Sequence, residues 1–280
     1  MRSLFFVIAF LFASCTDEPP PGVSSKSVGA TGPAVAQMAP EWMKWYFFVP
    51  QRSAPIPRFV GEEIHFDVKR GQCSTHKDAA GPSDCARRTT RSVVAKNKVF
   101  GPNLDFTVGH RYLITFEYWV DPNYRRNGAP VSIARFYGSL YPVNPIFDLK
   151  MDRQRGVTFL GLTCVPPQNL GGWHRFSVRM GLAADESGFL EVRCDGSQRI
   201  GSPILARSNV ITTAPWACVL NPRCNPRRAP VPQTFSLEAG IIADRRGGGF
   251  APIPPEGMRL KLRRITAKRL FVIIGLVDEA

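Results

Sequence analysis

Apolar and polar residues alternate with a period of two through most of the chain after about residue 60. The clearest runs are EIHFDVKR, RYLITFEYWV, FSVRM, GFLEVRC, FSLEAGI and MRLKLRRITAKRLF. Successive side chains of a β-strand point to opposite faces, so this pattern predicts strands with one buried face. Loop signals such as DPN, NPRCNP and RRGGG separate the runs, and no stretch keeps the helical period over three turns. The chain is therefore predicted to be all-β: a sandwich, a jelly roll or a barrel.

The last of these runs is the least regular. In LKLRRITAKR the alternation places Lys261, Arg263 and Ile265 on one face, so neither face is cleanly apolar. This predicts a strand near a sheet edge with exposed basic residues. The apolar end, FVIIGLV, is too short to span a membrane and is predicted to be a terminal strand.

The first 15 residues, MRSLFFVIAFLFASC, have the pattern of a secretion signal. Small residues directly before Cys15 are typical of a bacterial lipoprotein, in which this cysteine carries the lipid and anchors the protein to the membrane. Phe12 departs from the aliphatic residue usual at its place, so cleavage without lipidation stays an alternative. Residues 16–40 are rich in Pro, Gly and Ser and predict a flexible linker. Residues 41–280 are then the folded domain, and the expected location is the periplasm or the cell envelope.

Six cysteines remain after Cys15, an even number that favours disulfides in an exported chain. Two short pairs each flank a loop rich in Pro, Gly, Asp or Asn, which favours them, although six cysteines allow fifteen connectivities. A zinc site is the weaker alternative, because the chain has no CxxC motif and no nearby His pair. The predicted pairs are Cys73–Cys85, Cys164–Cys194 and Cys218–Cys224.

The chain has a net charge of +14, which points to an anionic partner. Outside the cytoplasm the candidates are acidic polysaccharide, anionic lipid and peptidoglycan-linked polymer; we expect no nucleic acid. A basic surface that only keeps the protein soluble is the alternative. We expect a monomer. We also expect no cofactor, because no nucleotide-binding glycine loop and no clustered set of calcium-binding oxygens appears.

Three stretches together resemble a known family. They are FDVKRGQCSTHKDAAGPSDCARRTTRS, GGWHRFSVRMGLAADESGFLEVRCDGSQRIG and FSLEAGIIADRR. In order and spacing they resemble bacterial polysaccharide lyases of the heparin lyase and alginate lyase type, over roughly residues 60 to 270. The resemblance implies a concanavalin A-like β-jelly roll with two curved antiparallel sheets and a polysaccharide groove on the concave face.

The family's catalytic positions are altered. Where its central strand has a glutamine and a histidine two residues on, this chain has Arg135 and Tyr137. Its late strand has a lysine and tyrosines, whereas Glu238 stands nearby here. The resemblance further implies substrate contacts from the early arginine strand and from a basic loop over the groove. The candidate substrate-binding residues are Arg88, Arg91, Glu238, Arg245 and Arg246.

An eliminating lyase must neutralise the uronate carboxylate, remove the proton on C5 and protonate the leaving oxygen on C4. The period of two places Arg135 and Tyr137 on one strand face, so the pair supplies candidates for these tasks. An ordinary tyrosine has a pKa near ~10 and needs neighbouring cations to act as a base. The hypothesis is that Arg135, Arg88 and Arg91 lower its pKa. In the alternative, the pair only binds carbohydrate.

Two other candidates are weaker. His174 begins a strand directly after Trp173, which favours a structural role. Glu191 and Asp195 share a strand face, but four residues separate them by about 13 Å. A glycosidase pair needs about 5.5 Å, or at most about 9.5 Å, so this pair fails as a hydrolase site. Together with the signal segment and the basic charge, the resemblance implies an exported lyase-like protein that cleaves an acidic polysaccharide by β-elimination. The alternatives are a lectin-like binding module and a structural envelope protein.

Overall fold

The computed structural model describes residues 47–48, 53–76, 83–96, 106–126, 130–138, 145–152, 154–195, 202–214, 231, 235–244 and 253–270. The predicted signal segment with Cys15, the linker of residues 16–40, the pair Cys218–Cys224 and the basic loop with Arg245 and Arg246 lie outside these ranges. No helix among the described residues is long and apolar enough to cross a membrane.

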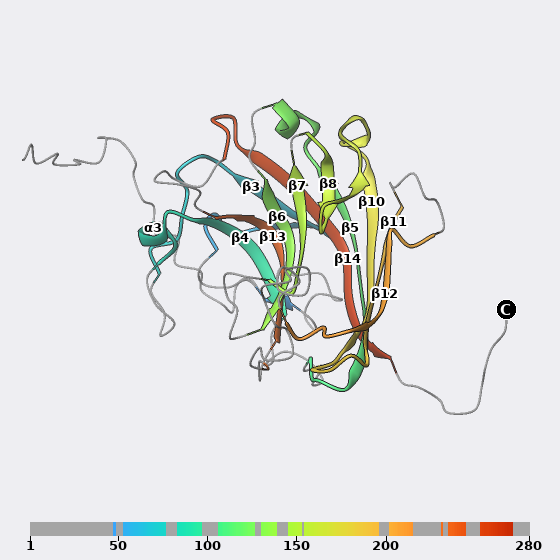
Figure 1. The fold of residues 1–280 in the computed structure, drawn as a ribbon. Coiled ribbons are helices and arrows are strands. Elements are labelled where there is room, and N and C mark those ends of the chain that lie inside the picture. Colours follow the sequence, from blue (N-terminus) through green and yellow to red (C-terminus); the bar gives the residue numbers. More distant parts are fainter. Residues whose placement is uncertain are drawn as a thin grey trace, which may run out of the picture.

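Within the described ranges, the strands form two antiparallel sheets of seven strands each, packed face to face (Figure 1). In spatial order the first sheet consists of β1 (Phe47–Phe48), β4 (Thr90–Lys96), β13 (Phe235–Ala243), β6 (Val131–Gly138), β7 (Phe147–Asp152), β8 (Gly156–Phe159) and β9 (Leu162–Val165). The second sheet consists of β12 (Leu205–Val210), β11 (Gly188–Cys194), β10 (Trp173–Leu182), β5 (His110–Val120), β14 (Met258–Leu270), β3 (Glu63–Val68) and β2 (Arg58–Val60). The predicted all-β jelly-roll fold class is confirmed.

Helical structure in the described ranges is limited to short connections. The helix α3 (Asp84–Arg87) precedes β4, and the 3-10 helices η1 (Pro122–Arg126) and η2 (Pro167–Asn169) follow β5 and β9. The Ser83 side chain caps α3 by accepting a hydrogen bond from the Ala86 amide. This cap fixes the helix directly before the strand that carries Arg91.

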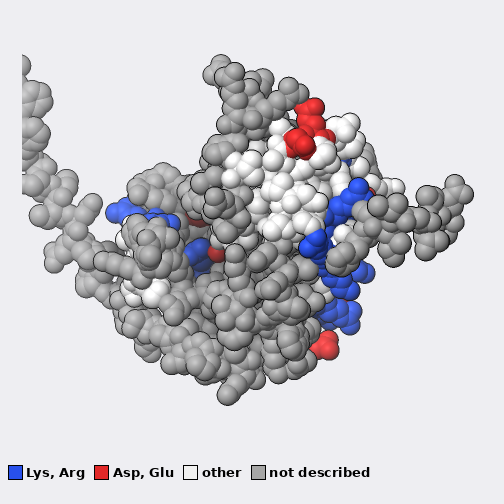
Figure 2. Space-filling model, turned by 90° about the horizontal axis from the view of Figure 1, so that it is seen from below, with Lys and Arg blue, Asp and Glu red and all other residues white. Residues whose placement is uncertain are grey.

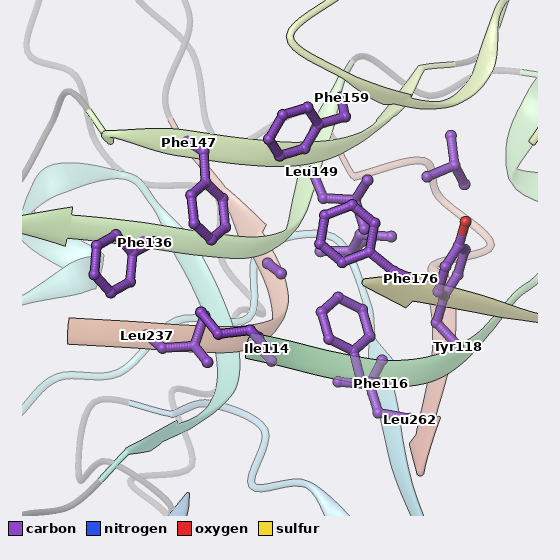
Figure 3. Packing of buried hydrophobic residues seen from close by; sticks show 14 of the residues in the cluster. Ile114, Phe116, Tyr118, Phe136, Phe147, Leu149, Phe159, Phe176, Leu237 and Leu262 are labelled. Atoms are coloured by element: carbon purple, nitrogen blue, oxygen red, sulfur yellow. The ribbon is translucent and has the colours of Figure 1, made fainter. Parts of the chain in front are cut away.

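Aromatic side chains from both sheets fill the core (Figure 3). Phe136 of β6 stacks on Phe147 of β7 with their ring centroids 5.3 Å apart. Phe159 of β8 meets Phe176 of β10 at 5.6 Å and so joins the two sheets. Fully burying each such ring contributes about 2 kcal/mol of apolar transfer free energy. The alternation seen in the sequence is the signature of this core, because every second residue of these strands points into it.

The disulfide Cys73–Cys85 ties the segment after β3 to α3. The disulfide Cys164–Cys194 joins β9 of the first sheet to β11 of the second. Two of the three predicted pairs are therefore present in the structure.

The expectation that LKLRRITAKR forms a strand near a sheet edge is wrong. The strand β14 lies between β5 and β3, inside the second sheet. Its pairing with β5 shifts between Arg263 and Thr266, and Arg264 adopts a positive φ of 53°. This bulge inserts one residue, so that Leu262 before it and Ile265 after it both point into the core. A simple alternation misses such a change of face.

Candidate functional site

Polar side chains of the first sheet gather on the face that points away from the core. They alternate with core residues along β4, β13, β6 and β7, which are adjacent strands. Two further acids come from α3 and from the residue after β13. We call this group the polar cluster; its members are Asp84, Arg91, Arg135, Tyr137, Asp148, Lys150, Glu238 and Asp244.

The backbone of β13 brings Glu238 to the centre of this group. Glu238 lies opposite Arg135 on β6 in the sheet register. At Gly240, φ is +142° and an added Cβ would lie 2.2 Å from the Ser92 carbonyl oxygen, so β13 approaches β4 too closely for any side chain there. The pairing with β6 shifts between Ala239 and Ile242. Only glycine fits this irregular point. It lies between Glu238 and Asp244, the two acids that β13 and the residue after it supply to the polar cluster.

Tyr137 and Arg91 meet at Glu238. The Tyr137 hydroxyl donates to Glu238 Oε1 over 2.9 Å, and Arg91 Nη1 donates to the same oxygen over 3.3 Å. Arg91 Nε also donates to Asp84 Oδ2 over 3.1 Å. The side chains of Asp84 and Glu238 are only 3% and 9% exposed, so Arg91 bridges two buried carboxylates. Burial disfavours the charged Arg91, but Glu238 and Asp84 outweigh it and raise its pKa.

Arg135 forms the second half of the polar cluster. Its Nε lies 3.5 Å from Asp148 Oδ2, and its Nη2 donates to Asp244 Oδ2. Lys150 Nζ lies 3.3 Å from Asp148 Oδ2. Arg135 is 13% exposed, whereas the side chains of Asp244 and Lys150 are 44% and 41% exposed. The partner of Arg135 that faces solvent is therefore Asp244.

The hypothesis that neighbouring arginines lower the pKa of Tyr137 is wrong. Burial of the phenol, followed by the charge of Glu238 and the hydrogen bond to it, raises the pKa well above its usual value, although Arg91 and Arg135 act in the opposite direction. The arginines lose most of their effect because each is paired with two carboxylates. Burial and Glu238 thus favour the neutral phenol of Tyr137.

Asp148 is the most unusual acid of the polar cluster. Burial raises its pKa in spite of Arg135 and Lys150. Its Oδ1 is buried and has no hydrogen-bond partner among the described residues. The charged form is therefore only partly compensated, which is costly unless a ligand supplies a donor.

The structure brings together four of the candidate residues found in the sequence: Arg91, Arg135, Tyr137 and Glu238. Arg88 does not belong to a strand but occupies the C-cap of α3, with a positive φ of 55°, and is exposed. His174 lies on β10, where its ring contacts the Asn169 carbonyl oxygen at 2.8 Å and Asp195 at 3.6 Å. It is remote from the polar cluster because β10 belongs to the other sheet.

Sequence reasoning missed the four acids and bases that surround these residues: Asp84, Asp148, Lys150 and Asp244. The signal for two of them was present, because FDLKMD alternates and places Asp148 and Lys150 on the face opposite Phe147 and Leu149. Asp84 comes from a short helix, and only the tertiary fold brings it to Arg91. No group of three or more His, Cys, Asp or Glu in the described ranges is placed to hold a metal ion.

No protein-family model and no curated protein matches this sequence. Among solved structures, the chain is similar to an endo-β-1,4-glucuronan lyase from the fungus Trichoderma reesei, at 12% identity over 79% of this chain and 86% of that chain, with a TM-score of 0.44. An alginate lyase from Corynebacterium sp. shows 8% identity over 78% and 82%, with a TM-score of 0.46. A Trypanosoma rangeli sialidase shows 12% identity over 78% of this chain but only 27% of its own, with a TM-score of 0.43. At these identities the likeness concerns the fold alone.

Proposed function

We propose that this protein acts on an acidic, uronate-containing polysaccharide at the polar cluster and cleaves it by β-elimination. The observation that carries the proposal is the contact between the Tyr137 hydroxyl and Glu238 Oε1, beside an arginine whose outer partner is exposed. Elimination needs a cation for the uronate carboxylate and groups that take and return a proton. All of these stand within one patch of four adjacent strands.

Arg135 is the group that neutralises the uronate. A substrate carboxylate displaces the exposed Asp244 from Nη2, while the buried Asp148 keeps the guanidinium in place from the other side. Bidentate pairing of arginine with a planar carboxylate makes this exchange favourable. Lys150, which is 41% exposed, gives the polymer a second cation on the neighbouring strand.

Tyr137 and Glu238 share the proton transfer. The Tyr137 oxygen accepts the C5 proton while its own phenolic proton passes to Glu238 Oε1, so no free phenolate has to form. The electron pair of the C5–H bond becomes the C4–C5 double bond, and the C4–O bond breaks. The proton then returns through Tyr137 to the leaving oxygen. The carboxylate that raises the pKa of Tyr137 is therefore also the acceptor that makes the hydroxyl a usable base.

A non-catalytic binding module is the second candidate. It is favoured by the raised pKa of Tyr137, which keeps the phenol protonated, and by the pairing of Arg91, Arg135 and Lys150 with acids. In this case the patch contacts uronates without removing a proton.

One assay separates the two. The purified protein is mixed with alginate, heparin, chondroitin, pectate or glucuronan, and the ultraviolet absorbance of the unsaturated uronate product is followed. We expect a rise with one polymer that the substitutions Tyr137→Phe and Glu238→Gln each abolish, while Arg155→Gln on the β7–β8 turn leaves it unchanged. Retardation in gels containing a polymer, without any rise in absorbance, would establish the binding module instead.

The proposal also includes the cellular context. We propose export by the N-terminal signal, lipid attachment at Cys15 and a monomeric state. The two disulfides support export, because such bonds persist in oxidising compartments. Mass spectrometry of the mature N-terminus tests the lipid.

A further inference from the structure

The outer face of the second sheet carries exposed cations, whereas the three cations of the polar cluster are each paired with acids. Four exposed cations on β5, β10 and β14 have no ion-pair partner among the described residues: Arg111, Arg175, Arg179 and Lys268. We call these four, together with Phe189 of β11, the basic face. Seen from below, basic side chains line the side of the molecule on which these strands run (Figure 2). This face and the polar cluster lie on opposite sides of the core.

The register places three of these cations at one end of the sheet. Arg179 of β10 lies opposite Leu113 of β5, which lies opposite Lys268 of β14. Arg111 is two residues from Leu113 on the same face of β5. With strands about 4.8 Å apart, the backbones of Arg179 and Lys268 are about 10 Å from each other. The three cations therefore form a compact group, with Arg175 further along β10.

Phe189 holds two of the arginines in place. The guanidinium carbons of Arg111 and Arg179 each lie 5.6 Å from the centroid of its ring. The ring fits there because position 181 is glycine: a Cβ on Gly181 would lie 2.7 Å from Phe189 Cε1. Cation–π contacts order the two guanidinium groups but do not neutralise them. Two like charges at one ring repel each other, and an anionic group between them removes that repulsion.

Among the described residues, the two acids that lie opposite these arginines in the sheet register are paired with other cations. Glu191, the residue opposite Arg179 on β11, is bonded to Arg193 over 2.8 Å. Glu117, the residue opposite Arg175 on β5, accepts from Arg263 over 2.6 Å and from Arg264 over 3.1 Å. These two acids are thus already engaged, and the positive charge of the basic face is available to a ligand.

The chemistry of the surface selects among polyanions. A membrane-binding face needs exposed apolar side chains that insert between lipids. The exposed large hydrophobic residues in the described ranges are Val60, Val108, Leu162 and Val231, and none of them belongs to β5, β10 or β14. Single-stranded nucleic acid needs free aromatic rings for stacking. Here Lys261 lies 5.2 Å from the centroid of the Trp119 ring and Arg263 lies 4.1 Å from that of the Trp173 ring. A cation therefore covers one side of each of these two rings, which leaves less of them free for bases to stack on.

We propose that the basic face is a second binding surface for a linear acidic polysaccharide, recognised through its carboxylate or sulfate groups. The ligand class is that of the proposed function, but the surface is separate from the polar cluster and does not depend on catalysis. Binding on this face holds the protein on the polymer and raises the effective concentration of chains at the polar cluster.

The test compares two double variants. Arg179→Gln with Lys268→Gln removes two cations of the basic face; Lys69→Gln with Arg155→Gln removes the same charges elsewhere. Dissociation constants for alginate and heparin are measured over a range of salt concentrations, with thermal unfolding as a check of the fold. We expect the first variant to bind about tenfold more weakly at low salt and with a smaller salt dependence, and the control to match the parent protein.

Three outcomes overturn this proposal: equal binding by both double variants, tighter binding of the parent protein to phosphatidylglycerol vesicles, or tighter binding to single-stranded DNA than to either polysaccharide. Cleavage of short uronate oligosaccharides is followed in parallel. If the basic-face variant loses polymer binding but keeps cleavage, both proposals stand. If the parent protein shows no cleavage but the variant still loses binding, the proposed elimination fails and the basic face remains.

Discussion

Replacing Arg91 by Met leaves two buried carboxylates without their shared cation. Asp84 and Glu238 are 3% and 9% exposed, and Arg91 donates to both. Breaking a buried ion pair by removing one partner costs about 3–5 kcal/mol, because the remaining charge stays desolvated. For a domain of this size we expect the midpoint of thermal unfolding to fall by about 10 °C. The assay is thermal unfolding followed by circular dichroism, together with urea denaturation.

The dependence on pH makes this prediction specific. In the Arg91→Met variant, protonation of the unpaired Asp84 and Glu238 removes the buried negative charge. The folded variant therefore binds protons that the unfolded chain takes up only in stronger acid. The loss of stability should therefore shrink as the pH falls from 7 toward about 4. Adding Glu238→Gln should restore part of the stability. Arg155→Met, which removes an exposed arginine paired with Asp152, is the matched control and should cost less than about 0.5 kcal/mol. A loss below about 1 kcal/mol for Arg91→Met, or one independent of pH, would refute the reasoning.

Three further outcomes test the fold. Gly240→Ala should destabilise the protein by more than about 3 kcal/mol in urea denaturation, because the new Cβ would lie 2.2 Å from the Ser92 carbonyl oxygen. Replacing Cys164 and Cys194 by Ser should cost about 3–4 kcal/mol, since the disulfide spans 30 residues; an unchanged urea midpoint would contradict this. The hydrogen bond with Asp195 raises the pKa of His174 in the folded protein. The pair therefore stabilises the fold below the pKa of an ordinary histidine, and this stabilisation is lost as the pH rises through the raised pKa of His174. Asp195→Asn should therefore destabilise slightly at about pH 6 and not at about pH 9.

The strands could be predicted from the sequence because burial on one face imposes the period of two. In β5 every second side chain from Tyr112 to Val120 is buried, as the alternation requires. The same rule fails at β14, where the bulge at Arg264 changes which side chains face the core. A bulge depends on pairing with β5 and β3, and the sequence of one strand does not reveal its partners. The prediction of an edge strand failed for this reason.

The candidate site was predicted in part, again for a physical reason. A shared strand face relates Arg135 to Tyr137, and this local relation is visible in the sequence. The pKa of Tyr137 is raised first by burial of the phenol and then by Glu238, which is 101 residues away in the sequence and lies 2.9 Å from its hydroxyl. Three arginines, Arg88, Arg91 and Arg135, suggested a lowered pKa, but the acids that neutralise Arg91 and Arg135 come from other elements. The sign of the shift could only follow from the tertiary structure.

The distribution of charge over the two sheets gives the net charge of +14 a structural meaning. On the first sheet, the cations are paired with acids that are largely buried. These ion pairs fix the positions of Arg91 and Arg135 around Tyr137. On the second sheet, Arg179 and Lys268 are exposed and unpaired within the described ranges, so their charge acts on the surroundings. Salt should weaken the second effect far more than the first, because exposed charges are screened and buried pairs are not. Binding of polymer should therefore fall steeply with ionic strength, whereas the turnover of bound oligosaccharide should not.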